Sequence, residues 1–258
     1  MKKLLLIVAA IGLFLGILVG TEASSKTLTL DKDTLIFRGE VDAKSVSSMI
    51  YKISSSKSNT IKMFITSPGG SVMHGSALID FMKASRKKFI CITDFAASMA
   101  FSIFQHCDRR YVLPSGILMQ HQSSWGVNGK DLENMAFIKL IQDLNDKNDR
   151  STAARMSMPV NMYRAFVQSD LWLFGHKALD LHGFEVADKV VYAKCTKKLL
   201  ESRITEKIPY GFSLIEVTWS GCPLIEAPIK VGDDDFISTK KTWNTQYIKK
   251  INGWKSNE

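Results

Sequence analysis

The sequence has few cysteines, and they follow no metal-binding pattern. Four cysteines occur among 258 residues, and they form no C-x-x-C or Cys/His cluster, so neither a zinc site nor any other metal or cofactor is expected. An even count permits disulfides in an exported chain. Cys195 and Cys222, which lie beyond the main motifs, are the preferred pair. Cys91 is expected to be a free thiol that acts as a small apolar side chain in a buried strand.

The sequence also lacks internal repeats, long low-complexity runs and a concentrated basic patch. The net charge is +9 at pH 7, but the basic residues are scattered and are not interleaved with aromatic residues on one predicted face. Nucleic-acid binding is therefore not expected, and the charge is interpreted as a solvated basic surface. With 45% hydrophobic and 23% charged residues, the composition is that of an ordinary globular protein.

The longest apolar run stands at the start of the chain. Two lysines precede an uncharged stretch, residues 4–20, and the small residues Thr21 and Ala23 form an acceptable cleavage site. We interpret residues 1–23 as a secretory signal. The alternative is an uncleaved anchor that associates with the membrane, because the run is near the lower limit for a spanning helix. Either way, the globular part is expected outside the cytoplasm, periplasmic or secreted if the segment is removed.

Short apolar runs alternate with longer amphipathic segments over the first half of the chain. The predicted elements are strand 33–41, helix 45–56, strand 59–70, helix 71–85, strand 87–95 and helix 96–107. Residues 109–124 are expected to form a short strand, a turn and a second short strand. This alternation predicts an α/β fold with crossover connections and a mainly parallel sheet.

Two later regions depart from the alternation. The amphipathic pattern from Asn128 to about Met158 predicts one long helix, suited to project and to pack against another subunit. After about Ser202, prolines, glycines and short β-like runs predict a small β-rich appendage. The expected organisation is therefore the N-terminal segment, a main domain over residues 24–202 and an appendage over residues 203–258.

Two turns rich in small residues follow predicted strands. In "TSPGGS", Gly69 and Gly70 free the backbone so that amides can point into a cleft, although the same pattern also forms an ordinary tight turn. In "AASMA", Ser98 stands at a predicted helix start, where it is either a packing residue or a nucleophile. The N–H of Met99 at that helix start is suited to stabilise an oxyanion.

A candidate base and a candidate carboxylate come later in the chain. His121 ends a predicted short strand in "LMQHQ" and is suited to accept the Ser98 proton. Asp170 opens a segment predicted to be helical, where it is either a helix N-cap or the carboxylate that orients His121. Each residue alone has a structural explanation, but their order along the chain favours a serine hydrolase.

Residues 33–193 resemble the proteolytic subunit of the Clp protease, a serine peptidase with a crotonase-like fold. The resemblance rests on five motifs in the family's order: "LIFRGEV", "SPGGSV", "AASMA", "LMQHQ" and "D-x7-A-x4-G-x4-DKVV". It implies repeated β-β-α units and a handle helix, from about Lys130 to Met158, through which heptameric rings stack. The site residues that it implies are Ser98 as nucleophile, His121 as general base, Asp170 as orienting carboxylate, and the amides of Gly69 and Met99 as oxyanion hole.

The resemblance implies a serine endopeptidase that cleaves peptides or unfolded proteins as a homo-oligomeric ring. The signal-like N-terminus departs from the family and leads us to expect an exported, ATP-independent form. An ATP-driven unfoldase partner is not expected, because ATP is absent outside the cytoplasm. The family's axial segment also has no clear counterpart between Ser24 and Asp33, and Ser123 replaces the proline that usually follows "HQ".

Three other functions are open from the sequence. The first is a catalytically inactive binding or scaffold protein on the same fold, favoured by the missing docking segment and the added appendage. The second is an acyl-CoA enzyme of the crotonase superfamily, which needs no Ser-His-Asp set. The third is a peptidase of the signal peptide peptidase A type, which uses a serine–lysine pair, whereas "HQ" at residues 121–122 favours a triad.

Overall fold

A computed structural model of the chain describes residues 27–124, 126, 128–210, 213–225, 227–232 and 234–235. The expected signal or anchor, residues 1–23, lies outside this described part, as do the last residues of the expected appendage. No helix within the described ranges is long and apolar enough to cross a membrane.

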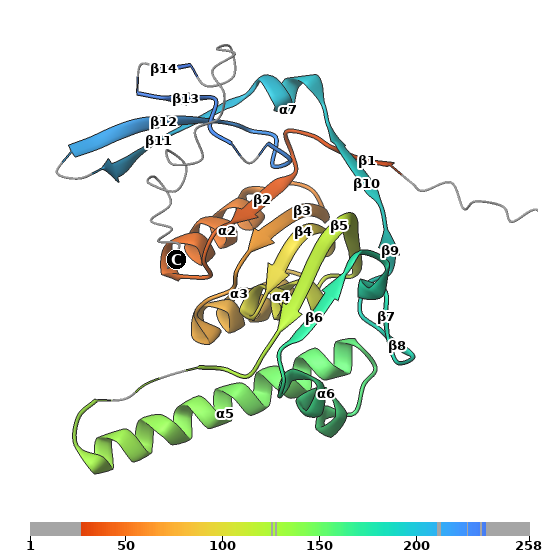
Figure 1. Cartoon of the computed structure of the whole chain (residues 1–258), viewed down its shortest axis with the longest axis vertical. Coiled ribbons are helices and arrows are strands. Elements are labelled where there is room, and N and C mark those ends of the chain that lie inside the picture. The colour runs from red at the N-terminus through yellow and green to blue at the C-terminus, as the bar shows by residue number, and fades with distance from the viewer. Residues whose placement is uncertain are drawn as a thin grey trace, which may run out of the picture.

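A six-stranded sheet forms the centre of the molecule (Figure 1). Its strands are β2 (Leu35–Arg38), β3 (Thr60–Ser67), β4 (Lys88–Ala97), β5 (Arg109–Gln120), β6 (Leu171–Phe174) and β9 (Lys189–Val190). They follow the order β2-β3-β4-β5-β6, and β9 also pairs with β5. Strands β2 to β5 are parallel, whereas β6 runs antiparallel to β5. The predicted α/β fold with a mainly parallel sheet is confirmed.

Both faces of this sheet are covered, which explains the apolar stretches Met63–Ile65 of β3 and Phe89–Ile92 of β4. One face packs on the helices α2 (Ala43–Ser55), α3 (Val72–Ala84) and α4 (Met99–Gln105). The other face packs on β1 (Thr27–Leu30), its parallel partner β10 (Tyr192–Cys195) and the short helix α7 (Lys197–Glu201). Because strand side chains alternate in direction, Met63 and Ile65 belong to the helical side and Phe64 to the other.

Two predicted boundaries near the carboxyl ends of the strands are wrong. Ala96 and Ala97, expected in a helix, are the last residues of β4. Residues 109–120 form one strand rather than two. The pairing of β4 with β5 jumps from Thr93–Val112 to Phe95–Ile117, so the intervening residues of β5 form an irregularity that takes up the proline and glycine without ending the strand.

The long helix α5 (Asp131–Arg155) runs past the carboxyl ends of the strands and extends beyond the body of the molecule (Figure 1). Its 25 residues correspond to a length of about 37 Å. Thr152 and Ala153 near its end are buried, whereas Leu132 near its start is 81% exposed. The predicted long helix is therefore present, with its end anchored and its start projecting. The helix α6 (Val160–Val167) follows it.

The predicted β-rich character of the C-terminal region agrees with the structure. An antiparallel sheet contains β11 (Arg203–Tyr210), β12 (Ser213–Ser220), β13 (Lys230–Val231) and β14 (Asp234–Asp235). The Cys195–Cys222 disulfide, the preferred pair, joins this region to β10. The guanidinium of Arg38 in β2 donates to the carbonyl of Pro223 at 2.9 Å, so this hydrogen bond joins the C-terminal region to β2. Between β6 and β9 lie the 3-10 turn η1 (Gly175–Ala178) and the small hairpin β7 (Asp180–Leu181) and β8 (Phe184–Glu185).

The expectation of a free thiol at Cys91 is wrong. Cys91, in the middle of β4, forms a disulfide with Cys107, which follows α4, and both residues are fully buried. Their Cα atoms are 5.9 Å apart. This disulfide was not predicted from the sequence because it depends on tertiary structure. The helix α4 folds back along β4, so that Cys107 lies beside Cys91.

Candidate active site

Ser98 occupies a sharp turn between β4 and α4. Its φ of +53° and ψ of −124° lie in a region that residues with a side chain rarely adopt. The Ser98 N–H donates to the carbonyl of Met119 at 2.9 Å, which holds the turn against β5. The hydroxyl does not cap the helix that it precedes. A strained strand-to-helix turn of this kind presents the serine oxygen at the edge of the sheet, as a nucleophile requires.

His121 lies directly after β5 and points its ring at this serine. The pairing of Ala97 with Met119 sets the ends of β4 and β5 side by side. The His121 Nε2 lies 2.9 Å from the Ser98 Oγ, within the range expected for a general base and its nucleophile. The structure therefore brings together two candidate residues that the sequence separates.

The glycine-rich loop approaches the same turn. A Cβ on Gly69, whose φ is +92°, would lie 2.6 Å from the Ala97 carbonyl oxygen and 2.6 Å from the Ser98 Cβ. Only glycine fits there. The Gly69 carbonyl accepts from the Val41 N–H, and the Ser71 N–H donates to the Val41 carbonyl, both at 2.8 Å. The segment after β2 thus pins the loop against the serine.

The two predicted oxyanion donors differ in availability. The Met99 N–H opens α4, where an amide has no acceptor within its own helix. The Gly69 N–H already donates to the Ser67 hydroxyl at 3.1 Å. A developing oxyanion at Ser98 would use the Met99 amide directly, and would have to displace the Ser67 hydroxyl to use the Gly69 amide.

Asp170 makes no hydrogen bond or ion pair with His121 among the described residues. The prediction that Asp170 opens a helix is wrong, since it follows α6 and precedes β6 in a left-handed turn with a φ of +52°. The register of β5 and β6 pairs Gln120 with Leu171, so the next pair along the ladder would be His121 and Asp170. Within the described part of the chain, however, no hydrogen bond or ion pair joins these two side chains, and Asp170 is exposed. The arrangement in the structure is a Ser98–His121 dyad.

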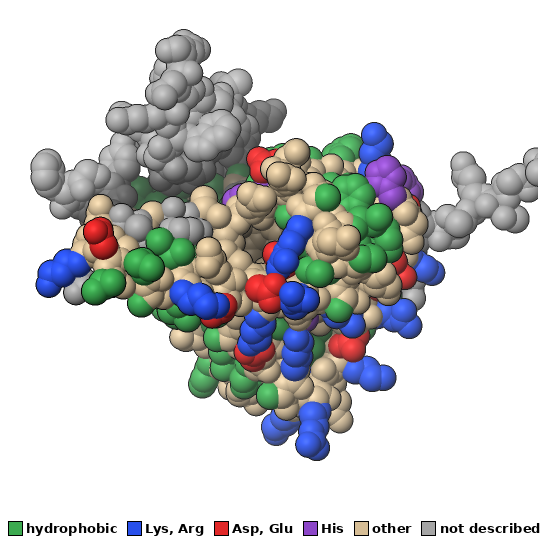
Figure 2. All heavy atoms as spheres, turned by 90° about the horizontal axis from the view of Figure 1, so that it is seen from below, with side chains coloured by type: hydrophobic (Ala, Val, Ile, Leu, Met, Phe, Trp, Pro, Cys, Tyr) green, Lys and Arg blue, Asp and Glu red, His purple; other side chains and the backbone are tan. Residues whose placement is uncertain are grey.

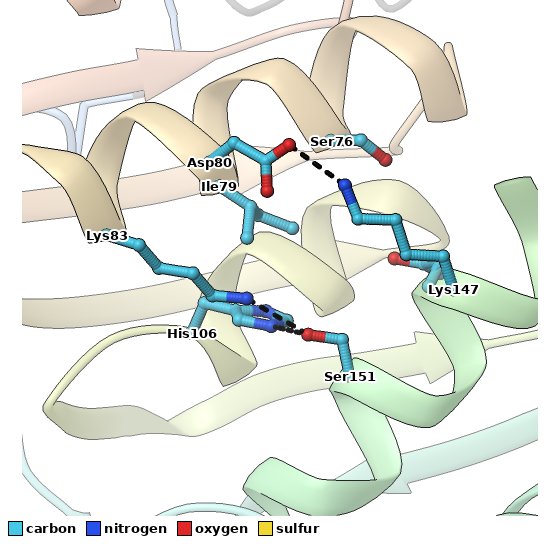
Figure 3. A pocket seen from close by; sticks show the side chains of 8 residues that line it. Ser76, Ile79, Asp80, Lys83, His106, Lys147 and Ser151 are labelled. Carbon is cyan, nitrogen blue, oxygen red and sulfur yellow. Dashed lines mark hydrogen bonds and ion pairs between the residues drawn. The ribbon is translucent and has the colours of Figure 1, made fainter.

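A second serine–histidine pair, missed from the sequence, lies between α3 and α5 (Figure 3). The Nε2 of His106 lies 2.6 Å from the Ser151 Oγ, and the Lys83 ammonium donates to that oxygen at 3.1 Å. On the rim, Lys147 pairs with Asp80 at 2.9 Å.

The cavity volume of about 10 Å³ holds roughly one water molecule, so a peptide does not fit. Burial lowers the His106 pKa to about 4, and the ring is neutral at pH 7. We interpret this pair as structural.

Two features of the described residues bear on metal and polyanion binding. Among residues 27–235 with their gaps, no group of three or more metal-ligating side chains is placed to hold an ion. On the side of α5, lysine and arginine side chains lie beside aspartate and glutamate rather than in a patch of one sign (Figure 2).

A serine at a strained turn after a parallel strand, with a histidine from the next strand at hydrogen-bond distance, is the arrangement of an α/β serine hydrolase. A family model described as Clp protease matches residues 22–193. Because the match covers most of the chain, the protein belongs to the Clp protease family, whose members are serine-type peptidases. The resemblance that the sequence motifs indicate is thereby confirmed.

Proposed function

We propose that the protein is an exported, ATP-independent serine endopeptidase that cleaves peptides or unfolded proteins. The observation that carries this proposal is the 2.9 Å contact between the Ser98 Oγ and the His121 Nε2 at a strained strand-to-helix turn. Membership of a peptidase family supports peptides as the substrate class. No metal or cofactor enters the proposed chemistry.

The reaction follows from the positions of these groups. The Ser98 oxygen attacks the scissile carbonyl carbon while His121 takes the hydroxyl proton, and the carbonyl oxygen becomes an oxyanion near the Met99 N–H. The C–N bond then breaks, and His121 gives its proton to the leaving amine. Water, deprotonated by His121, then attacks the acyl carbon. The ester bond to Ser98 breaks, and His121 returns the proton to the Ser98 oxygen as the acid leaves.

Asp170 completes this machinery in our proposal as the carboxylate that orients His121. Its backbone already stands next in line on the β5–β6 ladder. Rotation of Asp170 from its left-handed conformation to the extended one of a strand would continue the ladder and redirect its side chain. An active form with this change is what the proposal requires.

The two disulfides support export. Among the described residues every cysteine is paired, Cys91 with Cys107 and Cys195 with Cys222. Disulfides of this kind persist in oxidising compartments and are rare in the cytosol. We therefore place the protein in the periplasm or outside the cell, with residues 1–23 acting as a signal or as an anchor. Sequencing the N-terminus of the exported protein distinguishes the two.

Exposed apolar side chains support a ring assembly. They lie on the projecting half of α5 and on β6: Leu132, Met135, Phe137, Leu140, Trp172 and Phe174. Members of the family form oligomeric rings, and apolar surface of this extent on a soluble protein marks an interface. Light scattering of the purified protein is expected to give a mass of several subunits, and a monomer would remove the proposed role of α5.

The decisive test is labelling of the purified protein with a fluorophosphonate probe. Labelling is expected in the wild type and lost in Ser98→Ala and in His121→Ala, with circular dichroism showing that both variants fold. Labelling that survives Ser98→Ala would overturn the assignment of the nucleophile.

The second candidate function is a catalytically inactive binding or scaffold protein. The observation that favours it is that, among the described residues, no hydrogen bond or ion pair joins Asp170 to His121. An absence of labelling in every assembly state, with the protein folded, would select this function over the peptidase.

A further inference from the structure

The side-chain amide of Gln120, the residue before the candidate base His121, is buried. Gln120, the last residue of β5, is 4% exposed, and its side chain uses all of its hydrogen-bonding groups. Its Oε1 accepts from the His121 backbone N–H at 3.0 Å. Its Nε2 donates to the Tyr163 hydroxyl at 2.9 Å and to the Ser102 hydroxyl at 3.2 Å. Both N–H donors of this amide and its carbonyl oxygen thus have a protein partner.

The two anchors of this amide belong to the helices that flank the site. Ser102 is fully buried in α4, one helical turn after Ser98, and its N–H bonds to the Ser98 carbonyl at 3.3 Å. Tyr163 is 1% exposed in α6, the helix that leads to Asp170. Burial raises the pKa of the Tyr163 phenol, so this anchor stays protonated. From α5, the Asn148 amide also donates to the Ser102 hydroxyl at 3.2 Å.

The network fixes the backbone at the point where His121 leaves the sheet. Gln120 and Leu171 form the last pair of the β5–β6 ladder, so the His121 N–H has lost its strand partner and depends on the Gln120 side chain. That side chain is held by the helix that carries Ser98. The same amide therefore couples the histidine backbone to the helix of the nucleophile.

We propose that Gln120 is a positioning residue that sets His121 against Ser98, with Tyr163 and Ser102 as its anchors. This inference rests on the proposed function of the Ser98–His121 pair. Polar groups buried away from water hold their partners because any displacement leaves a donor or acceptor unpaired. A displacement of about 1 Å between reacting groups lowers rates roughly 100-fold. The buried hydrogen bonds of the Gln120 amide therefore hold the His121 ring in position.

The test compares Gln120→Met with Gln105→Met. Gln105 is a matched control because it is also a fully buried glutamine of the α4 region, where it bonds the Val186 carbonyl at 3.0 Å and the Arg110 guanidinium at 2.8 Å, away from the reacting pair. Both variants are expected to unfold at lower denaturant concentration. Only Gln120→Met is expected to lower kcat and the rate of fluorophosphonate labelling, by roughly 10- to 100-fold, with KM unchanged.

Tyr163→Phe serves as a milder variant if Gln120→Met does not fold. It removes one hydroxyl, and a loss of kcat smaller than that of Gln120→Met is expected, again at constant KM. Equal losses of stability and an unchanged labelling rate in the Gln120 and Tyr163 variants would overturn the positioning role and leave the network purely structural.

Hydrogen exchange at the His121 amide separates this inference from the proposed function. The exchange rate is measured in Ser98→Ala and in Ser98→Ala combined with Gln120→Met, where no catalysis is needed. Faster exchange at His121 in the double variant, with other amides of β5 unchanged, supports the positioning role even if the wild type is not labelled. Unchanged exchange at His121 overturns it even if the wild type is an active peptidase.

Discussion

The disulfide between Cys91 and Cys107 closes a loop that contains Ser98. The bond joins the middle of β4 to the residue after the C-cap of α4, and the two cysteines are 16 residues apart in sequence. The strand, the strained turn and the helix of the candidate nucleophile therefore form one covalently closed unit. The second disulfide, Cys195–Cys222, closes a loop outside this unit.

Removal of the first disulfide is expected to affect both stability and activity. A closed loop of this length contributes about 3 kcal/mol to the free energy of unfolding, so Cys91→Ala with Cys107→Ala should lower it by that order. Because α4 is then free to shift relative to β4, kcat is expected to fall about 10-fold or more. Urea denaturation and peptide hydrolysis at a temperature where the variant is folded measure the two effects. Cys195→Ala with Cys222→Ala is the control, with a similar loss of stability and full kcat.

Gly69→Ala is expected to lower the rate at which Ser98 is labelled by about 100-fold or more. The added Cβ would lie 2.6 Å from the Ala97 carbonyl oxygen, so the loop must move away from the serine and its amide with it. Loss of an oxyanion donor lowers rates by about 100-fold or more. Gly183→Ala is the matched control, because Gly183 has a φ of +90° and open space around it. It should cost about 1 to 2 kcal/mol of stability through strain alone. Equal labelling of the two variants would contradict the proposed role of the loop.

Asp170→Asn tests whether a third residue acts in catalysis. The side chain is exposed, so the free energy of unfolding should not change. If Asp170 turns toward His121 in the active form, kcat is expected to fall by roughly 1,000- to 10,000-fold. Steady-state hydrolysis of a fluorogenic peptide measures it. A loss of less than about 10-fold would show that the Ser98–His121 dyad works without this carboxylate.

The folded protein is expected to lose stability as the pH falls from about 6.5 to about 4. Burial, together with the nearby charges of Lys83 and Arg155, lowers the pKa of His106 to about 4, whereas an unfolded histidine has its usual pKa of 6.5. Between these values the unfolded chain binds one more proton, which favours unfolding by an amount on the order of 3 kcal/mol. Urea denaturation across this pH range should show a shallower slope for His106→Gln. The exposed His176 provides the control variant, His176→Gln, with the wild-type slope.

The periodicity of the chain was sufficient to predict the central architecture. Short strands with apolar centres, such as Met63–Ile65 of β3, separated by amphipathic helices, imply a parallel sheet covered on both faces, and the structure has one. The predicted boundary was wrong where the strand β4 leads directly into the helix α4. Ala96 and Ala97 suit a helix by composition, but their pairing with Leu118 and Met119 of β5 makes them strand.

The sequence by itself determined which residue types stand at the turns. A serine flanked by alanines after β4, two glycines after β3 and a histidine after β5 are local features, because the ends of strands are readable from apolar runs and turn residues. Only the tertiary structure decided how these residues meet. The 2.9 Å contact of Ser98 with His121 depends on the register of β4 with β5. Asp170, one residue past the last β5–β6 pair, has a left-handed backbone and makes no hydrogen bond with His121 among the described residues. Neither a register nor a backbone dihedral is encoded by neighbouring residues alone.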